Sequence, residues 1–267
     1  MQVAVTTDTV SGMRPAEAEK LGIGVVAMPF MIDGRDYREG VDLDEAGFYA
    51  RTKASGVEYH TSQPTIEAVA EVWDKALADH DQLVHVPMSS GLSGTANTLR
   101  LVAESDRYRG RVFVPDSRGL APVEKYQARE ALTLAERGYS GQEICRILER
   151  DRDKSSIYIG VSTLEYLRKG GRLKPAAYSL GMLLRIRPVL SIINGGRLDV
   201  YAKVRTRNKL KETLIQALHE DLVKRWNDPE GGSRVIIMTE ANSSVKSKVL
   251  KLLPKLKTEE TDSLCVA

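Results

Sequence analysis

The chain has 267 residues, of which 42% are hydrophobic and 28% charged, and its formal net charge is +3. This length and balance are typical of a globular protein with two domains. The sequence contains no run of about 18 apolar residues, so a membrane-spanning protein is excluded.

The first 150 residues alternate between predicted strands and predicted helices. Apolar runs predict strands at residues 3–6, 25–32, 83–87 and 111–114. Helical spacing of apolar residues predicts helices at residues 15–21, 44–54, 65–78, 96–104, 122–137 and 142–150. This alternation predicts an α/β fold with a doubly wound parallel sheet and helices on both faces.

The segment from Pro87 to Thr95 joins a predicted strand to the following helix and is rich in glycine and hydroxyl side chains. Glycine lets the backbone approach a ligand closely, and a helix N-terminus directs N–H groups and a positive dipole end toward it. The loop therefore predicts a site for an anionic head group, while capping of the helix by Ser93 or Thr95 is the simpler alternative. The residues singled out here are Ser89, Ser90, Gly91, Ser93, Gly94 and Thr95.

Polar residues also follow two other predicted strands of this half. Asp8 lies in Thr7-Asp8-Thr9 after the first strand, and Asp116 lies in Asp116-Ser117 after the last one. Because ligands of doubly wound sheets bind beyond the carboxyl ends of the strands, we expect both aspartates near the same site.

The pattern changes after about residue 153. We expect a strand at 157–162, a short helix at 163–167 and a β-hairpin formed by 189–193 and 198–204. A helix at 209–226, a strand at 235–239, a helix at 243–256 and a last strand at 264–266 complete the chain. These elements predict a C-terminal α+β domain with a largely antiparallel sheet, and domains covering residues 1–153 and 154–267.

Two further polar segments are candidates for binding. Thr61 and Ser62 precede the helix predicted at 65–78, where they either bind a ligand or cap the helix ahead of Pro64. The segment 167–172 places three cations around two glycines, which suits a phosphate, an acidic protein surface or simply the C-terminal end of a helix.

The two cysteines and the N-terminal residues indicate the cellular compartment in which we expect the protein. Cys145 and Cys265 lie far apart and outside any metal-binding spacing, so we expect two reduced thiols and no metal site. No basic leader or apolar segment precedes the first strand, so we expect a cytoplasmic protein.

The charge is divided unevenly along the chain. Residues 151–267 contain 22 Lys and Arg against 13 Asp and Glu, a net +9, and the first 150 residues carry −6. A basic half favours an acidic partner, an anionic surface or a nucleic acid, although lysines scattered over solvated helix faces give the same count.

Taken in order, these segments resemble the DegV family of bacterial fatty-acid-binding proteins. The resemblance extends over nearly the whole chain. A single matching motif would be weak evidence for the family, but seven motifs in the same order are strong evidence. The matching segments are 7–9, 61–64, 89–95, 116–117, 167–172, 187–190 and 203–206.

The resemblance implies a non-catalytic carrier of what is known as the EDD fold. It implies that a long-chain fatty acid such as palmitate or oleate lies between the two domains, with its carboxylate bound by Thr61 and Ser93. A separate fatty-acid kinase then phosphorylates the acid for phospholipid metabolism, and no cofactor is needed. The resemblance makes Arg168, Lys169, Arg172 and Arg205 candidates for contact with the kinase or its phosphate donor. Transient contact with a membrane surface is also expected.

The C-terminal end departs from the family pattern. Family members usually continue past a strand like 264–266 into a His-x-Gly-Pro-Gly segment whose histidine joins the carboxylate network, whereas this sequence ends at Ala267. The comparison leaves either a truncated chain or a head-group site with one donor fewer, and such a loss costs on the order of 1.5–3 kcal/mol of binding.

Two other classes of function compete with the carrier. A serine-dependent ester hydrolase would use Ser93 as its nucleophile, but the surrounding Ser-Gly-Leu-Ser-Gly departs from the Gly-x-Ser-x-Gly elbow. A nucleic-acid-binding module would use the basic C-terminal half, which holds few aromatics and no RNA-binding signature, so we expect no nucleic-acid partner.

Overall fold

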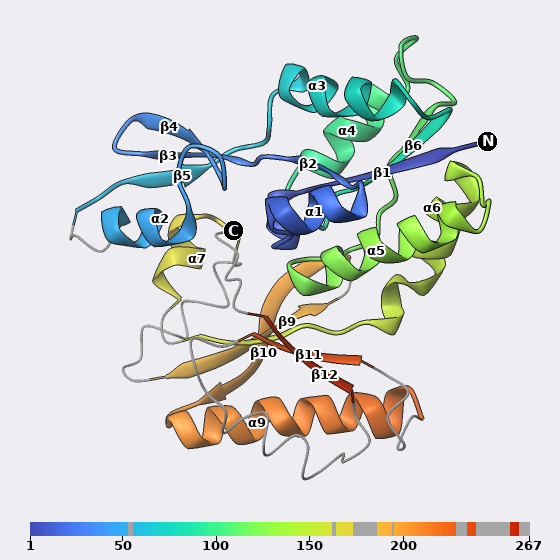
Figure 1. Cartoon of the computed structure of the whole chain (residues 1–267). Helices are drawn as coiled ribbons and strands as arrows, with labels where there is room; N and C mark the ends of the chain where they lie inside the picture. Colours follow the sequence, from blue (N-terminus) through green and yellow to red (C-terminus); the bar gives the residue numbers. More distant parts are fainter. Residues whose placement is uncertain are drawn as a thin grey trace. The chain divides into compact units, whose positions relative to one another are not determined.

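The computed structural model describes residues 1–52, 56–161, 164–172, 186–193, 195–227, 234–238 and 257–261 (Figure 1). The chain forms two compact units, Met1–Asp153 and Lys154–Leu264.

A four-stranded parallel sheet forms the centre of the first unit. Its strands are β1 (Val3–Asp8), β2 (Gly24–Val26), β6 (Gln82–Val86) and β7 (Val112–Phe113), in the order β2-β1-β6-β7. All three strand pairs are parallel, with Thr7 of β1 opposite Val86 of β6. Every residue of β1 is buried, as expected of a strand covered on both faces. The predicted α/β fold is confirmed.

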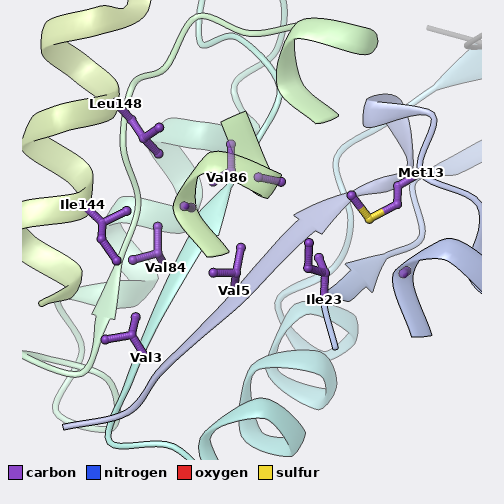
Figure 2. Close-up of a cluster of buried hydrophobic side chains, with 11 residues drawn as sticks. Val3, Val5, Met13, Ile23, Val84, Val86, Ile144 and Leu148 are labelled. Carbon is purple, nitrogen blue, oxygen red and sulfur yellow. The ribbon is translucent and has the colours of Figure 1, made fainter. Parts of the chain in front are cut away.

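Helices cover both faces of this sheet. On one face, α1 (Pro15–Leu21), α5 (Pro122–Glu136) and α6 (Gly141–Asp151) bury a cluster in which Ile144 and Leu148 approach the strand valines (Figure 2). On the other face, α3 (Ile66–Leu77) and α4 (Thr95–Ala103) pack Trp73 and Leu99 against Leu83. Short 3₁₀ turns, Thr9–Ser11 and Arg152–Lys154, follow β1 and α6.

The single strand predicted at residues 25–32 is wrong. The run divides after β2, and β3 (Pro29–Ile32) joins a separate antiparallel sheet, β4-β3-β5, with β4 (Arg35–Arg38) and β5 (Tyr59–Thr61). Pro29 has no N–H for continued pairing, which explains the break. Asp33 and Gly34 both have positive φ and close the β3–β4 turn. Helix α2 (Glu45–Thr52) adds Phe48 to the small core of this sheet.

The second unit contains the predicted antiparallel hairpin. Strands β8 (Tyr158–Gly160), β9 (Arg187–Ile193) and β10 (Arg197–Val204) are ordered β10-β9-β8 and pair antiparallel. A short α7 (Glu165–Lys169) follows β8, and α9 (Arg207–Glu220) follows β10. The helix predicted to reach residue 226 ends at Glu220 and continues as a π-helical turn, Asp221–Arg225.

A parallel pair, β11 (Arg234–Met238) and β12 (Lys257–Thr261), completes the described part of this unit. The sequence analysis missed β12, because Lys-Thr-Glu-Glu-Thr shows no apolar alternation. The helix predicted at 243–256 and the strand predicted at 264–266 lie outside the described residues. None of the described helices has both the length and the apolar character to cross a bilayer.

Candidate functional site

The loop between β6 and α4 lies where the strand order of the parallel sheet reverses. Strands β1 and β6 are neighbours there, and the chain continues outward from each in opposite directions. In doubly wound sheets this switch point is where ligands bind. The backbone N–H of Met88 donates to Asp8 Oδ2 at 3.0 Å, and Val10 N donates to Asp8 Oδ1 at 2.8 Å. Asp8, 1% exposed, thus fastens the start of the loop to the end of β1.

Two more contacts hold the same loop from the side of β7. Ser89 N donates to the carbonyl of Gly119 at 2.8 Å, and the Ser90 hydroxyl donates to Asp116 Oδ1, also at 2.8 Å. Asp116 N in turn donates to Glu149 Oε1 on α6 at 2.9 Å. The loop is therefore attached to both neighbouring strand ends.

Asp116 also lies within 4.0 Å of three guanidinium groups. The distances to Arg100, Arg118 and Arg152 are 4.0, 3.7 and 3.6 Å. These cations hold the carboxylate in place, so that it accepts the Ser90 hydroxyl and orients that side of the loop. We therefore expect Asp116 to position the loop through Ser90 rather than to bind a ligand itself.

Ser93 carries a hydroxyl close to the start of α4. Ser93 Oγ accepts from Thr95 N at 3.2 Å and lies 2.7 Å from Thr95 Oγ1. The N-cap residue of α4 is Gly94, and no side chain caps the helix there. The simple alternative is borne out in part: Ser93 lies one residue before the N-cap position, yet its half-buried side chain accepts the first N–H of the helix.

Thr61 was expected to open α3, and this expectation is wrong. Thr61 is the last residue of β5, and the cap of α3 is Thr65, whose Oγ1 accepts from Ala68 N at 3.2 Å. Pro64 disfavours a helical backbone at the residue before it, so the helix begins after the proline. Thr61 is half-buried, and its hydroxyl forms no hydrogen bond with any residue that the structure describes.

Gln63 brings the two hydroxyl-bearing segments together. Its Oε1 accepts from Thr98 Oγ1 on α4 at 2.8 Å. A Cβ placed on Gly94 would lie 2.6 Å from Gln63 Nε2, so the amide rests directly on the helix start. Thr61 and Ser93 are thus carried by two segments in contact with each other. Ser62, between Thr61 and Gln63, is exposed.

The geometry gives the hydrolase alternative no support. Ser93 Oγ contacts Thr95 rather than an imidazole. His85 is fully buried on β6, where Nδ1 lies 2.9 Å from Thr6 Oγ1, and burial lowers its pKa to about 3. Within the described residues, no group of His, Cys, Asp and Glu side chains is arranged to hold a metal ion.

The basic residues expected to meet a partner are exposed in the second unit. Arg168 and Lys169 end α7, Arg172 follows in the next turn, and Arg205 follows β10. Gly171 has a φ of 70°, and its N–H donates to the carbonyl of Arg168 at 3.1 Å. The turn is therefore a regular helix ending that presents its cations to solvent.

Three residues that shape this site could not be assigned from the sequence: Gln63, Gly119 and Glu124. Gln63 stands out there only as part of the segment 61–64. Gly119 accepts a hydrogen bond from the loop, and a Cβ there would lie 2.9 Å from Glu124 Cα. Glu124 is completely buried. Its place in the sequence held a signal, because it shares a helix face with buried Ala128 and Ala131.

Comparison with known proteins agrees with this architecture. A family model described as "Uncharacterised protein, DegV family" matches residues 2–265. A DegV domain-containing protein of Deinococcus radiodurans is 31% identical over 238 residues, covering 89% of this chain and 82% of that protein. One from Clostridium acetobutylicum is 30% identical and covers 84% and 79%.

Solved structures similar to this chain include proteins described as binding fatty acids. DegV of Bacillus subtilis, described as a fatty acid binding protein, aligns with a TM-score of 0.80 at 25% identity, covering 97% of this chain and 92% of that one. A Thermotoga maritima protein described as revealing fatty acid binding function aligns with a TM-score of 0.76 at 29% identity, covering 97% and 90%. The predicted resemblance is confirmed, and this chain belongs to the DegV family.

Proposed function

We propose that this protein binds a long-chain fatty acid, such as palmitate or oleate, and that Thr61 and Ser93 bind its carboxylate. The observation that carries the proposal is the contact of Gln63 with Gly94 and Thr98, which joins the two hydroxyl-bearing segments. The similar proteins from Bacillus subtilis and Thermotoga maritima, described as fatty-acid binders, support the same ligand.

The groups around this point suit a carboxylate, which accepts hydrogen bonds and carries negative charge. The Thr61 hydroxyl has a proton to donate. Ser93 Oγ accepts from Thr95 N and can accept from Thr95 Oγ1, which leaves its own proton for the ligand. The N-terminus of α4, where Gly94 is the N-cap residue, adds a positive dipole end. Hydrogen bonds to a charged group are the stronger kind, and the acyl chain adds about 0.8 kcal/mol for each buried CH₂.

The proposed role is that of a cytoplasmic, non-catalytic carrier that presents the carboxylate to a separate fatty-acid kinase. In that step a carboxylate oxygen bonds to the phosphoryl phosphorus of the kinase's phosphate donor while the donor's own P–O bond breaks. The acyl phosphate then enters phospholipid metabolism. The exposed cations Arg168, Lys169, Arg172 and Arg205 would contact the kinase or its phosphate donor. The carrier would also contact a membrane surface transiently.

Paired substitutions test the head-group assignment. Thr61→Val keeps the shape of the side chain and removes its hydroxyl, and Ser93→Ala removes the other. Each is expected to weaken palmitate binding about 10- to 100-fold, the equivalent of one hydrogen bond to a charged group. Thr133→Val, on the exposed part of α5, is the matched control and should bind like wild type. If Thr61→Val and Ser93→Ala both bind palmitate as tightly as the control, these hydroxyls are not the ligands.

A further inference from the structure

Two buried carboxyl groups meet at the end of β1, beneath the loop of the candidate site. Asp8 is 1% exposed and Glu124, from the first turn of α5, is 0% exposed. Asp8 uses one oxygen for Val10 N and the other for Met88 N. Glu124 Oε1 lies 3.2 Å from the Thr7 hydroxyl, which also donates to the Val86 carbonyl at 2.8 Å. Because Thr7 has only one proton to share, Glu124 is weakly satisfied on that side.

The other oxygen of Glu124 faces no hydrogen-bond donor among the described residues. The side chains of Asp8 and Glu124 are hydrogen-bonded to each other. Two ionised carboxylates are both acceptors and repel each other, so they can only make this contact with a proton between them. Asp8 already accepts two backbone N–H groups, an arrangement that favours its ionised form, so the proton belongs to Glu124.

The charges around Glu124 favour the same assignment. Burial and then the neighbouring Asp8 raise the pKa of Glu124 well above its usual value, and Glu39, which follows β4, raises it further. Burial also raises the pKa of Asp8, against the opposing effect of its hydrogen bonds. The one cation beside it in sequence, Lys125, is paired with Glu17 of α1. The charged groups acting on Glu124 are therefore acidic.

We propose that Glu124 is a positioning residue of the head-group site: it remains a neutral carboxylic acid whose proton bridges to Asp8, and this bridge fixes Met88 and the loop Ser89–Gly94. The second attachment of the loop depends on the same helix turn, because Ser89 donates to Gly119 and Gly119 packs against the backbone of Glu124. The consequence for ligand binding rests on the proposed function, whereas the proton bridge itself does not.

Unfolding of the ligand-free protein over a pH series tests the bridge. Glu124→Gln keeps the shape, supplies an N–H for Asp8 and needs no proton from solvent. Wild type must hold one extra proton in the native state between the usual Glu pKa of about 4.3 and the raised one. Unfolding of wild type therefore releases one proton. The ratio of its equilibrium constant for unfolding to that of Glu124→Gln should rise by up to tenfold per pH unit from pH 5.5 upward. Glu136→Gln, exposed on the same helix, is the control and should stay parallel to wild type. If Glu124→Gln is parallel as well, Glu124 holds no proton and the proposal is wrong.

Two further readouts test the connection to the loop. Asp8→Ala should speed hydrogen exchange at the Met88 amide at least tenfold more than Glu124→Gln does, and equal exchange in both variants would contradict the positioning role. Palmitate affinity of wild type should fall once the pH exceeds the raised pKa of Glu124, while that of Glu124→Gln should not change over the same range. The same pH profile in both proteins would also contradict the positioning role. If neither protein binds palmitate at any pH, the proposed function fails, and the bridge is still decided by the unfolding series.

Discussion

Gly119 is predicted to be the most sensitive glycine of the head-group region. An alanine Cβ at this position would lie 2.0 Å from Gln127 Oε1 and 2.9 Å from Glu124 Cα. The buried amide of Gln127 can turn aside only by breaking its hydrogen bond to the Ser117 carbonyl, and the helix backbone at Glu124 cannot move, so the loop from 116 to 121 has to shift. Overpacking of this kind lowers the free energy of unfolding by about 1–3 kcal/mol. Replacing glycine by alanine also restricts the unfolded chain, which offsets about 0.4–1 kcal/mol of this loss. A net loss of about 1.5 kcal/mol lowers the melting temperature of a unit of this size by about 3–6 °C.

Gly94→Ala is the matched substitution for this measurement. Its Cβ would lie 2.6 Å from Gln63 Nε2, the mobile end of a side chain that is itself exposed, and so can be accommodated at little cost in stability. Thermal unfolding followed by circular dichroism should show Gly119→Ala melting several degrees below Gly94→Ala. Palmitate titration should show weaker binding for Gly94→Ala, because Gln63 is displaced from the helix start. Equal melting temperatures for Gly119→Ala and wild type would refute the close packing of Gly119 on α5.

Three other outcomes are expected. The charge reversal Arg168→Glu/Arg172→Glu should leave palmitate affinity within twofold of that of wild type and should slow acyl-phosphate formation by the kinase at low salt. An unchanged rate would show that these cations only end a helix in solvent and do not contact the kinase. Burial raises the pKa of the Cys145 thiol to about 12, so little reactive thiolate exists at pH 8 in the native protein. In a Cys265→Ser background, an aromatic disulfide reagent at pH 8 should therefore modify Cys145 at least 100-fold faster in denaturant than in the native protein. Equal rates would count against the burial of Cys145. The Leu148 side chain is 1% exposed in the cluster of Figure 2, so Leu148→Ala should lower the free energy of unfolding in urea by about 2–5 kcal/mol. The Leu101 side chain is 76% exposed, and Leu101→Ala should change this free energy very little. Similar losses in both variants would argue against the assigned core.

The central sheet could be predicted because its strands are short apolar runs bounded by polar turns. Val3–Asp8 and Gln82–Val86 are buried on both faces, so their sequences carry an unbroken signal. The small sheet of β3, β4 and β5 was missed because its strands are short, and β4, Arg-Asp-Tyr-Arg, buries only Tyr37. Its pairing depends on contacts distant in sequence, such as Phe30 opposite Thr61, which periodicity does not reveal.

The candidate site could be predicted in its segments but not in its local geometry. The motifs identified the loop from Ser89 to Gly94 and the segment around Thr61, but the N-cap positions are Gly94 and Thr65 rather than Ser93 and Thr61. Cap rules recognise residue types near a helix start, and both segments offer several suitable hydroxyls, so the sequence could not select Thr65 or Gly94. Glu124 required the tertiary structure, because only the fold reveals that this helix face turns toward Asp8.

Native mass spectrometry of the freshly purified protein, followed by delipidation and calorimetric titration with palmitate, tests the central claim most directly. The account predicts an added mass equal to one long-chain fatty acid in the purified protein, and one-to-one rebinding of palmitate that weakens at least tenfold in Thr61→Val/Ser93→Ala. Absence of any co-purified fatty acid, together with no heat of binding for palmitate or oleate in the delipidated protein, would contradict it.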